Sequence, residues 1–207
     1  MASTRSYGGQ SADERVAARR ARLIEATIKL LAEQGEARTT MTAACAGAGL
    51  TERYFYESFG SRDVALVAAL DAAASQIAET AVAAVAERNG SPVDRVRAGL
   101  SAVLDLLGTH PALGRVVVLE STANEALRTR RRELLVWFGD IVAAEARSIY
   151  GERVWPADRA RLNAVAFVAG LGELVAAWLL GELDLTPERL VELGTDLFAA
   201  TAQRPDA

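Results

Sequence analysis

The side chains best suited to chemistry lie in one short stretch near the N-terminus, "AACAGAGLTERYFYESFGSRDVAL". It holds the hydroxyl of Thr51, the guanidinium groups of Arg53 and Arg62, and the phenols of Tyr54 and Tyr56. Arginine can pair in a bidentate manner with guanine or with a phosphate, and tyrosine can donate a hydrogen bond to a phosphate oxygen. These groups suit contact with nucleic acid, provided that the fold presents them on one surface.

The elements expected around these residues are two short helices joined by a glycine-containing turn. Thr40 predicts the N-cap of the first helix, which should end at Gly49. Thr51 should cap the second helix, which carries Phe55 and Phe59 four residues apart and therefore on one face. We expect the two rings to anchor this helix on its neighbours and to leave its polar residues exposed. This arrangement is a helix-turn-helix, in which the N-terminal turn of the second helix meets base edges.

The composition favours an all-helical chain. The protein has 207 residues, of which 51% are hydrophobic, with 5 prolines and a single cysteine. One cysteine cannot form an intramolecular disulfide, and we expect neither a signal peptide nor an apolar run able to cross a bilayer. These features predict a soluble cytoplasmic protein.

The charge is unevenly distributed, although the net charge of −4 does not itself indicate a nucleic-acid-binding protein. Up to Arg62, 9 Arg and Lys residues stand against 7 Asp and Glu residues, whereas the remainder has 14 against 20. The mildly positive end coincides with the expected helix-turn-helix, where a phosphate-binding surface could lie.

Apolar periodicity, capping residues and breaks predict an all-α fold of about nine helices. Residues 1–10 are mostly Ser, Gly and Gln, and we expect a disordered arm there. The helix-turn-helix domain should cover residues 11–66, and a second domain residues 67–207. The expected helices cover residues 11–34, 40–49, 51–59, 61–88, 93–109, 113–119, 124–150, 156–180 and 186–203.

The N-terminal stretch resembles the DNA-binding domain of the tetracycline-repressor (TetR) family of transcriptional regulators. The likeness rests on Thr39-Thr40, "AGAGLTERYFYESF" and "SRDVAL", which are similar to the family pattern T-T, I-A-x-x-A-G-V-S-x-G-T-L-Y-x-H-F and S-K-E-x-L. Tyr56 and Arg62 stand where the family has a tyrosine and a lysine that touch phosphate. Taken with the exposed helix faces, the candidate DNA-binding residues are Thr40, Thr51, Glu52, Arg53, Tyr54, Tyr56 and Arg62.

The chain departs from the family pattern at two places. Ala44 and Cys45 stand where Ile-Ala is usual, so a large core side chain is missing from the first short helix. Arg53 and Tyr54 stand where Gly-Thr is common. Tyr54 could fill the volume that Ala44 leaves, or it could read a base. We interpret Cys45 as a small buried residue rather than a redox sensor.

The stretch "LNAVAFVAGLGELVAAWLLG" at residues 162–181 is apolar on nearly every side and therefore belongs in a core or an interface. The resemblance implies that this helix and the last one pair with their copies in a homodimer. The alternative is that both helices complete the core of a monomer. The candidate interface residues are Ala166, Gly170, Ala177, Leu190, Leu193, Leu197 and Phe198.

The resemblance also implies that the second domain binds a small-molecule effector between its middle helices, with ordinary core packing as the alternative. The run "RTRRRE" from Arg128 is interpreted as a solvated helix face, and a second DNA patch or a gate for an anionic ligand are the alternatives. His110, before Pro111, suggests a turn or cap residue. The candidate ligand-binding residues are Leu104, Leu107, Val116, Glu120, Trp137, Phe138, Ile141, Asn163, Phe167, Leu171, Glu173 and Trp178.

Together these features predict a homodimeric transcriptional repressor that an apolar effector releases from a palindromic operator. We expect operator DNA, a second copy and the effector as partners, with no cofactor, metal, membrane association or enzymatic activity. Two alternatives remain: an all-helical enzyme using a glutamate pair such as Glu120 and Glu173, and a protein-interaction module that does not bind DNA. A steep loss of duplex binding with rising salt would distinguish a DNA-binding protein from such a module.

Overall fold

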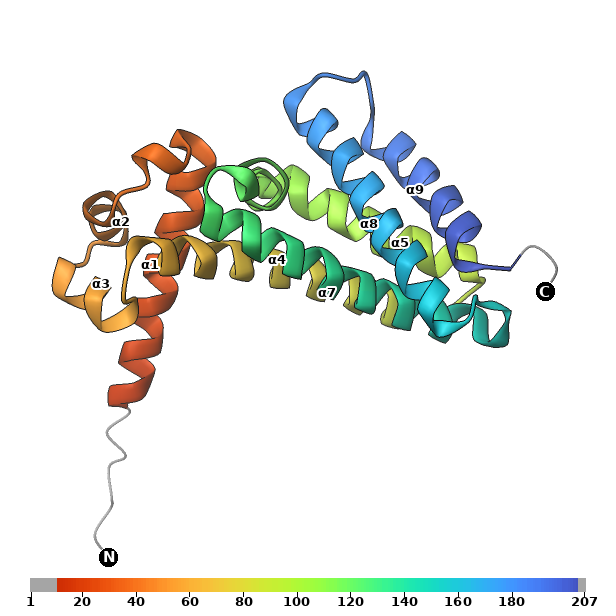
Figure 1. Ribbon diagram of the computed structural model, residues 1–207, viewed down its shortest axis with the longest axis horizontal. Coiled ribbons are helices and arrows are strands. Elements are labelled where there is room, and N and C mark those ends of the chain that lie inside the picture. The colour runs from red at the N-terminus through yellow and green to blue at the C-terminus, as the bar shows by residue number, and fades with distance from the viewer. Residues whose placement is uncertain (1–10, 205–207) are drawn as a thin grey trace, which may run out of the picture.

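The computed structural model describes residues 11–204, so the arm predicted for residues 1–10 lies outside the described part of the chain. Within the described residues the fold has nine α-helices and no β-strand, which confirms the predicted all-α class (Figure 1). The helices are α1 (Ala12–Gln34), α2 (Met41–Ala48), α3 (Glu52–Ser58), α4 (Arg62–Glu87), α5 (Pro92–Thr109), α6 (Pro111–Gly114), α7 (Glu125–Tyr150), α8 (Ala157–Leu180) and α9 (Pro187–Ala202).

Local capping signals begin most of these helices. At α1, the Ser11 hydroxyl accepts the Glu14 N–H at 3.1 Å and the Glu14 carboxylate accepts the Ser11 N–H at 2.7 Å. Ser91 and Asp94 form the same reciprocal pair at the start of α5. Gly35, with φ of 76°, follows the last turn of α1. Because these signals involve residues close in sequence, the observed bounds follow the predicted ones closely.

Helices α1 to α3 and the start of α4 form a small N-terminal unit (Figure 1). Its core uses small residues on α2: Ala44 and Cys45 are buried, and a Cβ added to Gly47 would lie 3.3 Å from the Ala26 Cβ on α1. The small side chains thus let α2 approach α1 closely, in place of the large residue that the family pattern has. Burial raises the pKa of the Cys45 thiol, in keeping with a core role.

Helices α4 to α9 form the larger C-terminal unit (Figure 1). Helix α4 is 26 residues long, begins beside α3 and packs against α5 and α7 in the bundle. The boundary predicted between residues 66 and 67 falls inside this continuous helix. A change in the direction of α4 therefore affects both units.

Two helices are more apolar than the sequence analysis expected. By length and composition alone, α4 and α8 could cross a membrane, and so could α5 and the bent segment after it if taken as one span. The prediction that no apolar run has this length and composition is wrong, because alanine-rich helices reach a high mean hydropathy with few bulky side chains. Only 17% of the apolar window of α8 is buried within the chain, so much of this helix is exposed.

Candidate DNA-binding surface and ligand cavity

A tight turn joins α2 to α3. Gly49 adopts the left-handed conformation, with φ of 62° and ψ of 40°, and the Leu50 N–H donates to the Cys45 carbonyl at 2.9 Å. The Arg22 guanidinium of α1 donates to the Ala48 carbonyl, and a Cβ added to Gly49 would lie 3.1 Å from its Nη2 atom. Both the backbone conformation and the neighbouring arginine therefore favour glycine here.

Two phenylalanines fix α3 on the N-terminal unit, as the sequence predicts. Phe55 and Phe59 are each 1% exposed, and their ring centroids lie 5.4 Å apart. The Arg20 guanidinium lies 4.3 Å from the Phe59 ring centroid and donates to the Ser58 carbonyl at 2.6 Å. A cation at the C-terminal end of α3 complements the helix dipole. The opposite face of α3 is thereby presented outward.

Three of the seven predicted DNA-binding residues, Thr51, Arg53 and Tyr56, lie exposed at the start of α3 or on its outward face. The Arg53 side chain is 83% exposed and pairs with Glu57 at 2.9 Å, one helical turn away. Tyr56 is 60% exposed, and the exposed hydroxyl of Thr51 makes no capping hydrogen bond. An exposed i,i+4 ion pair is weak, so the Arg53 guanidinium can exchange Glu57 for a base edge at little cost.

The other predicted DNA-binding residues of this surface make contacts within the unit. Glu52 accepts a hydrogen bond from the Thr42 hydroxyl of α2 at 3.0 Å, and Thr40 caps α2 by accepting the Ala43 N–H at 3.1 Å. Tyr54 is partly buried under the Arg19 guanidinium of α1, 4.5 Å from the ring centroid. Tyr54 therefore packs on α1 and does not fill the core beside Ala44.

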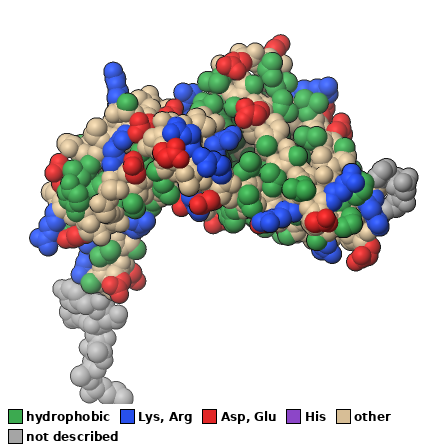
Figure 2. All heavy atoms as spheres, in the orientation of Figure 1, with side chains coloured by type: hydrophobic (Ala, Val, Ile, Leu, Met, Phe, Trp, Pro, Cys, Tyr) green, Lys and Arg blue, Asp and Glu red, His purple; other side chains and the backbone are tan. Residues whose placement is uncertain are grey.

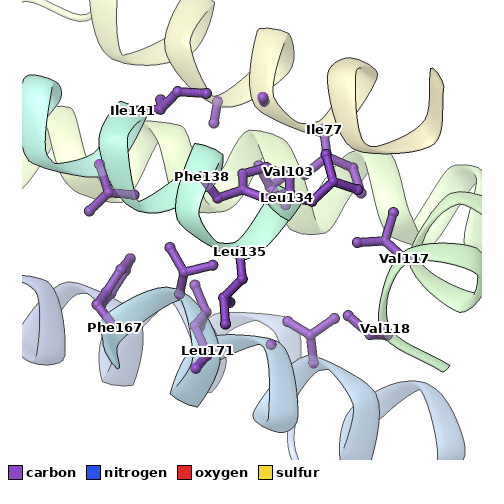
Figure 3. Close-up of a pocket in the computed structure, with 18 of the residues that line it drawn as sticks. Ile77, Val103, Val117, Val118, Leu134, Leu135, Phe138, Ile141, Phe167 and Leu171 are labelled. Carbon is purple, nitrogen blue, oxygen red and sulfur yellow. The ribbon is translucent and has the colours of Figure 1, made fainter. Parts of the chain in front are cut away.

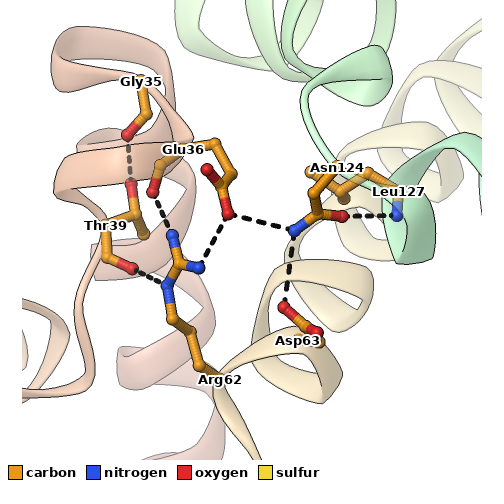
Figure 4. Close-up of polar contacts among 7 residues, drawn as sticks. All are labelled: Gly35, Glu36, Thr39, Arg62, Asp63, Asn124 and Leu127. Atoms are coloured by element: carbon orange, nitrogen blue, oxygen red, sulfur yellow. Dashed lines mark hydrogen bonds and ion pairs between the residues drawn. The ribbon is translucent and has the colours of Figure 1, made fainter.

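Arg62 is a predicted phosphate contact, but its guanidinium is hydrogen-bonded to neighbouring groups of the protein (Figure 4). Its Nε donates to the Thr39 carbonyl at 2.7 Å and its Nη1 to the Glu36 carboxylate at 2.7 Å, while Nη2 donates to the Glu36 carbonyl. Three of the five guanidinium N–H donors are therefore used within the protein. The structure thus favours a structural role for Arg62 over the predicted phosphate contact.

Asn124 connects this arginine to the C-terminal unit (Figure 4). Its Nδ2 donates to the Glu36 carboxylate at 3.1 Å and, more weakly, to Asp63 at 3.4 Å, while its Oδ1 caps α7. Hydrogen bonds from Arg62 and from Asn124 hold the pKa of the Glu36 carboxyl below its ordinary value. Glu36, Arg62, Asp63 and Asn124, here the junction cluster, join the end of α1 to the starts of α4 and α7.

A cavity of about 230 Å³ lies between α4, α5, α7 and α8 in the C-terminal unit (Figure 3). Its lining is apolar except for Arg131 and Glu173. A neighbouring cavity of about 90 Å³ continues towards the far end of the bundle. Six of the twelve predicted ligand-binding residues line the larger cavity: Leu107, Phe138, Ile141, Phe167, Leu171 and Glu173.

Four apolar candidates lie outside this lining. Leu104 and Val116 are buried in the main hydrophobic core, which Trp178 also packs against. Trp137 is 38% exposed on the surface of α7. Helical periodicity marks such residues as apolar, but it does not say which of several buried faces borders a cavity.

Two polar residues predicted to bind the ligand also lie outside the lining of the larger cavity. The Asn163 Nδ2 donates to the Thr201 carbonyl at 2.8 Å and so ties α8 to α9. The Glu120 carboxylate lies near Gly35 at the end of α1, 3.8 Å from where a Cβ would stand. Glu120 is thus not part of the cavity lining, to which Glu173 belongs.

Three cavity residues of α7, Arg131, Leu134 and Leu135, are not among the predicted ligand-binding residues. Arg131, Leu134, Leu135 and Phe138 line the cavity. Their three- and four-residue spacing places them on one face of the helix. This spacing is visible in the sequence, but the other arginines of "RTRRRE" hide it, so the run as a whole indicates a solvated face, with a gate for an anionic ligand as one of the alternatives.

Two predicted interface residues are buried in the core of the chain itself. Leu190 is 0% exposed in the main core, and Phe198 is 5% exposed, with its ring centroid 5.4 Å from that of Phe167. The assignment of these two residues to the interface is therefore wrong: α9 packs on α5 and α8 of its own chain, which buries them in its core. Leu193, Leu197 and Ala177 are partly buried.

The unpartnered face of α8 is a stripe of small and apolar residues. Leu162, Ala166, Gly170 and Leu180 are exposed, with Leu162 at 71%, and Glu173 is the charged residue among them. Figure 2 shows hydrophobic side chains spread over the part of the surface where α8 and α9 lie. Spacings of three and four residues make the stripe continuous along the helix. Its small residues would let another helix approach closely.

The structure thus combines an exposed helix-turn-helix with a helical bundle that contains an apolar cavity. No protein-family model matches the sequence, and no curated protein matches it. Solved structures do match, over most of both chains.

The FadR transcriptional regulator from Bacillus subtilis, solved in complex with stearoyl-CoA, has a TM-score of 0.69 at 20% identity, covering 87% of this chain and 96% of that one. A TetR-like regulator from Rhodococcus sp. RHA1 has a TM-score of 0.65 at 22% identity, covering 88% and 94%. A TetR family regulator from Marinobacter aquaeolei VT8 has a TM-score of 0.62 at 18% identity, covering 93% and 100%. The fold is therefore that of the TetR-family transcriptional regulators.

Proposed function

We propose that the protein is a homodimeric, ligand-responsive transcriptional repressor of the TetR family, acting in the cytoplasm on a palindromic operator. The observation that carries the proposal is the outward face of α3. This face exposes Arg53, Tyr56 and Thr51, while Phe55 and Phe59 hold the helix rigidly on α1. The structural likeness to transcriptional regulators along nearly the whole chain supports the same function.

Dimerisation would follow from the exposed stripe of α8. A stripe with Leu162 at 71% exposure leaves apolar surface in water unless a partner covers it. A second copy covers it with the same stripe, in an interface with two-fold symmetry. Two copies of α3 then lie on one side of the dimer. Such a pair would read half-sites about 34 Å apart along the duplex.

The cavity supports control by an effector. Leu70 and Ile77 of α4 line it, as do Leu134 and Phe138 of α7, and both helices begin at the junction cluster. A ligand that separates α4 from α7 would shift their starts relative to one another and reorient the helix-turn-helix. It would thereby favour a state in which the two α3 helices no longer match adjacent grooves. The stearoyl-CoA bound by FadR is consistent with a long apolar effector in such a cavity.

The test is binding to two duplexes at several salt concentrations: a site selected from a random library and a scrambled version of it. We expect Arg53→Ala to weaken binding to the selected duplex by roughly 1–3 kcal/mol and to spare the scrambled one, because the side chain reads a base. The control is Arg97→Ala, which removes an exposed arginine from α5. If the wild-type protein selected no duplex, or if its affinity did not depend on salt, DNA binding would be refuted.

A further inference from the structure

The lining of the larger cavity holds one cation and one carboxylate among apolar residues. Arg131 lines it from α7, and its Nη2 lies 3.5 Å from the Glu173 carboxylate of α8. The ion pair is long, and the Glu173 side chain is 76% exposed in a single copy, so the pair is open to water except where a second copy covers the stripe of α8. Such a pair contributes little, and Arg131 can change partner at small cost.

The neighbouring arginines of α7 are held more firmly. Arg130 pairs with Asp71 at 2.6 Å and with Glu133 at 2.5 Å. Arg128 pairs with Glu125 at 3.0 Å. Neither Arg128 nor Arg130 lines the cavity. Arg131 therefore combines a loose partner with a place on the cavity wall.

The apolar space beyond Arg131 is elongated. The larger cavity and its smaller neighbour share lining residues, among them Ile141, Val142 and Phe167. On α7 the combined lining runs from Arg131 to Ile149. At a rise of about 1.5 Å per residue, this stretch of α7 is about 27 Å long. A long unbranched apolar tail fits this shape better than a compact ring system.

From this arrangement we propose that the effector is a single-chain amphiphile with a carboxylate head group, which Arg131 binds in place of Glu173. The inference rests on the proposed function of the cavity as an effector site. A guanidinium pairs with a carboxylate in a bidentate manner, and the position of Glu173 shows that a carboxylate fits there. A singly charged head matches a single arginine, whereas a multiply charged phosphate would lack partners. Glu145 lines the smaller cavity, so the anionic head belongs at the Arg131 end.

The experiment measures binding of four probes with the same tail by calorimetry, without DNA and below their micelle concentrations. The probes are dodecanoate, dodecyl phosphate, dodecanol and dodecylamine. We expect dodecanoate to bind most tightly. Arg131→Gln should weaken its binding by about tenfold or more, as loss of a charge-assisted pair implies, and should leave dodecanol unchanged. Glu173→Gln should strengthen dodecanoate binding, because it removes the competing carboxylate.

Two controls make the outcome decisive. Arg132→Gln removes an arginine that is 69% exposed and lies outside the cavity lining, and it should change no affinity. Leu171→Trp should fill the cavity and abolish binding of every probe. If dodecanol bound as tightly as dodecanoate and Leu171→Trp excluded both, the head-group inference alone would be overturned. If no probe bound to the wild-type protein, the proposed function of the cavity as an effector site would be refuted together with the head-group inference.

Discussion

Replacing Arg62 by alanine tests whether this residue holds the protein together or holds DNA. The substitution removes three hydrogen bonds from a charged donor to Thr39 and Glu36. Each such bond contributes about 1.5–3 kcal/mol when buried, but this side chain is 35% exposed and the three act together. We therefore expect a total loss of about 2 kcal/mol, or a fall in Tm of about 4–8 °C for a chain of this size.

The assay is thermal unfolding followed by circular dichroism, alongside the salt dependence of duplex binding. With an internal role, Arg62→Ala lowers the Tm and leaves the slope of log affinity against log salt unchanged. The matched variant is Arg62→Lys, which keeps the positive charge but lacks the planar fork that reaches three acceptors. It should lose most of the same stability and keep the salt slope.

A phosphate contact predicts the reverse pattern. Arg62→Ala would then leave the Tm unchanged, weaken selected and scrambled duplexes alike, and flatten the salt slope by about one unit. Arg62→Lys would restore duplex binding. That pair of results would refute the reasoning from the hydrogen bonds and reinstate the phosphate contact predicted from the sequence.

The remaining predictions concern pH, the turn and the dimer. The pKa of the Glu36 carboxyl is lowered in the folded protein, so its contribution to stability is present above the ordinary glutamate pKa of about 4.3 and is lost as pH falls through the lower folded value. The free energies of unfolding of wild type and Arg62→Ala, measured by urea titration, should converge in that acid range. A difference between them that did not shrink would contradict this linkage. Gly49→Ala puts a side chain into the left-handed region and should destabilise the protein by about 1–2 kcal/mol, measured by thermal melting; an unchanged Tm would mean that the turn relaxes freely. Leu162→Glu places a charge in the exposed stripe of α8, so light scattering should show a monomer while the circular dichroism spectrum stays unaltered. The control, Val93→Glu on α5, should stay dimeric. A dimeric Leu162→Glu variant would place the interface elsewhere.

The helices and the helix-turn-helix could be predicted from the sequence because the residues that specify them lie close together in the chain. Ser11 and Thr40 bond to residues three positions away, and Gly49 needs a backbone conformation that other residues rarely adopt. Phe55 and Phe59 lie on one face of α3 by helical geometry alone. Such features depend on spacings within one or two turns, so a single sequence contains them.

The partners of long side chains could not be predicted in this way. Arg62 carries the charge expected of a phosphate contact, but its acceptors come from Glu36 and Thr39, more than twenty positions away. Phe198 has the spacing of an interface stripe, but Phe167 of the same chain covers it. Each outcome depends on which helix packs against which, and an apolar stripe looks the same whether its own chain or a second copy covers it.

For residues 11–204, the sequence by itself determined the helices, the turn between α2 and α3, and the aromatic anchors, because backbone propensity and capping act within a few residues. Only the tertiary structure decided that Arg131 borders a cavity whereas Arg130 is bound to Asp71 of α4. The two arginines are adjacent and chemically identical. The helical rotation of about 100° between neighbours points them at different surroundings, and those surroundings are supplied by residues distant in the chain.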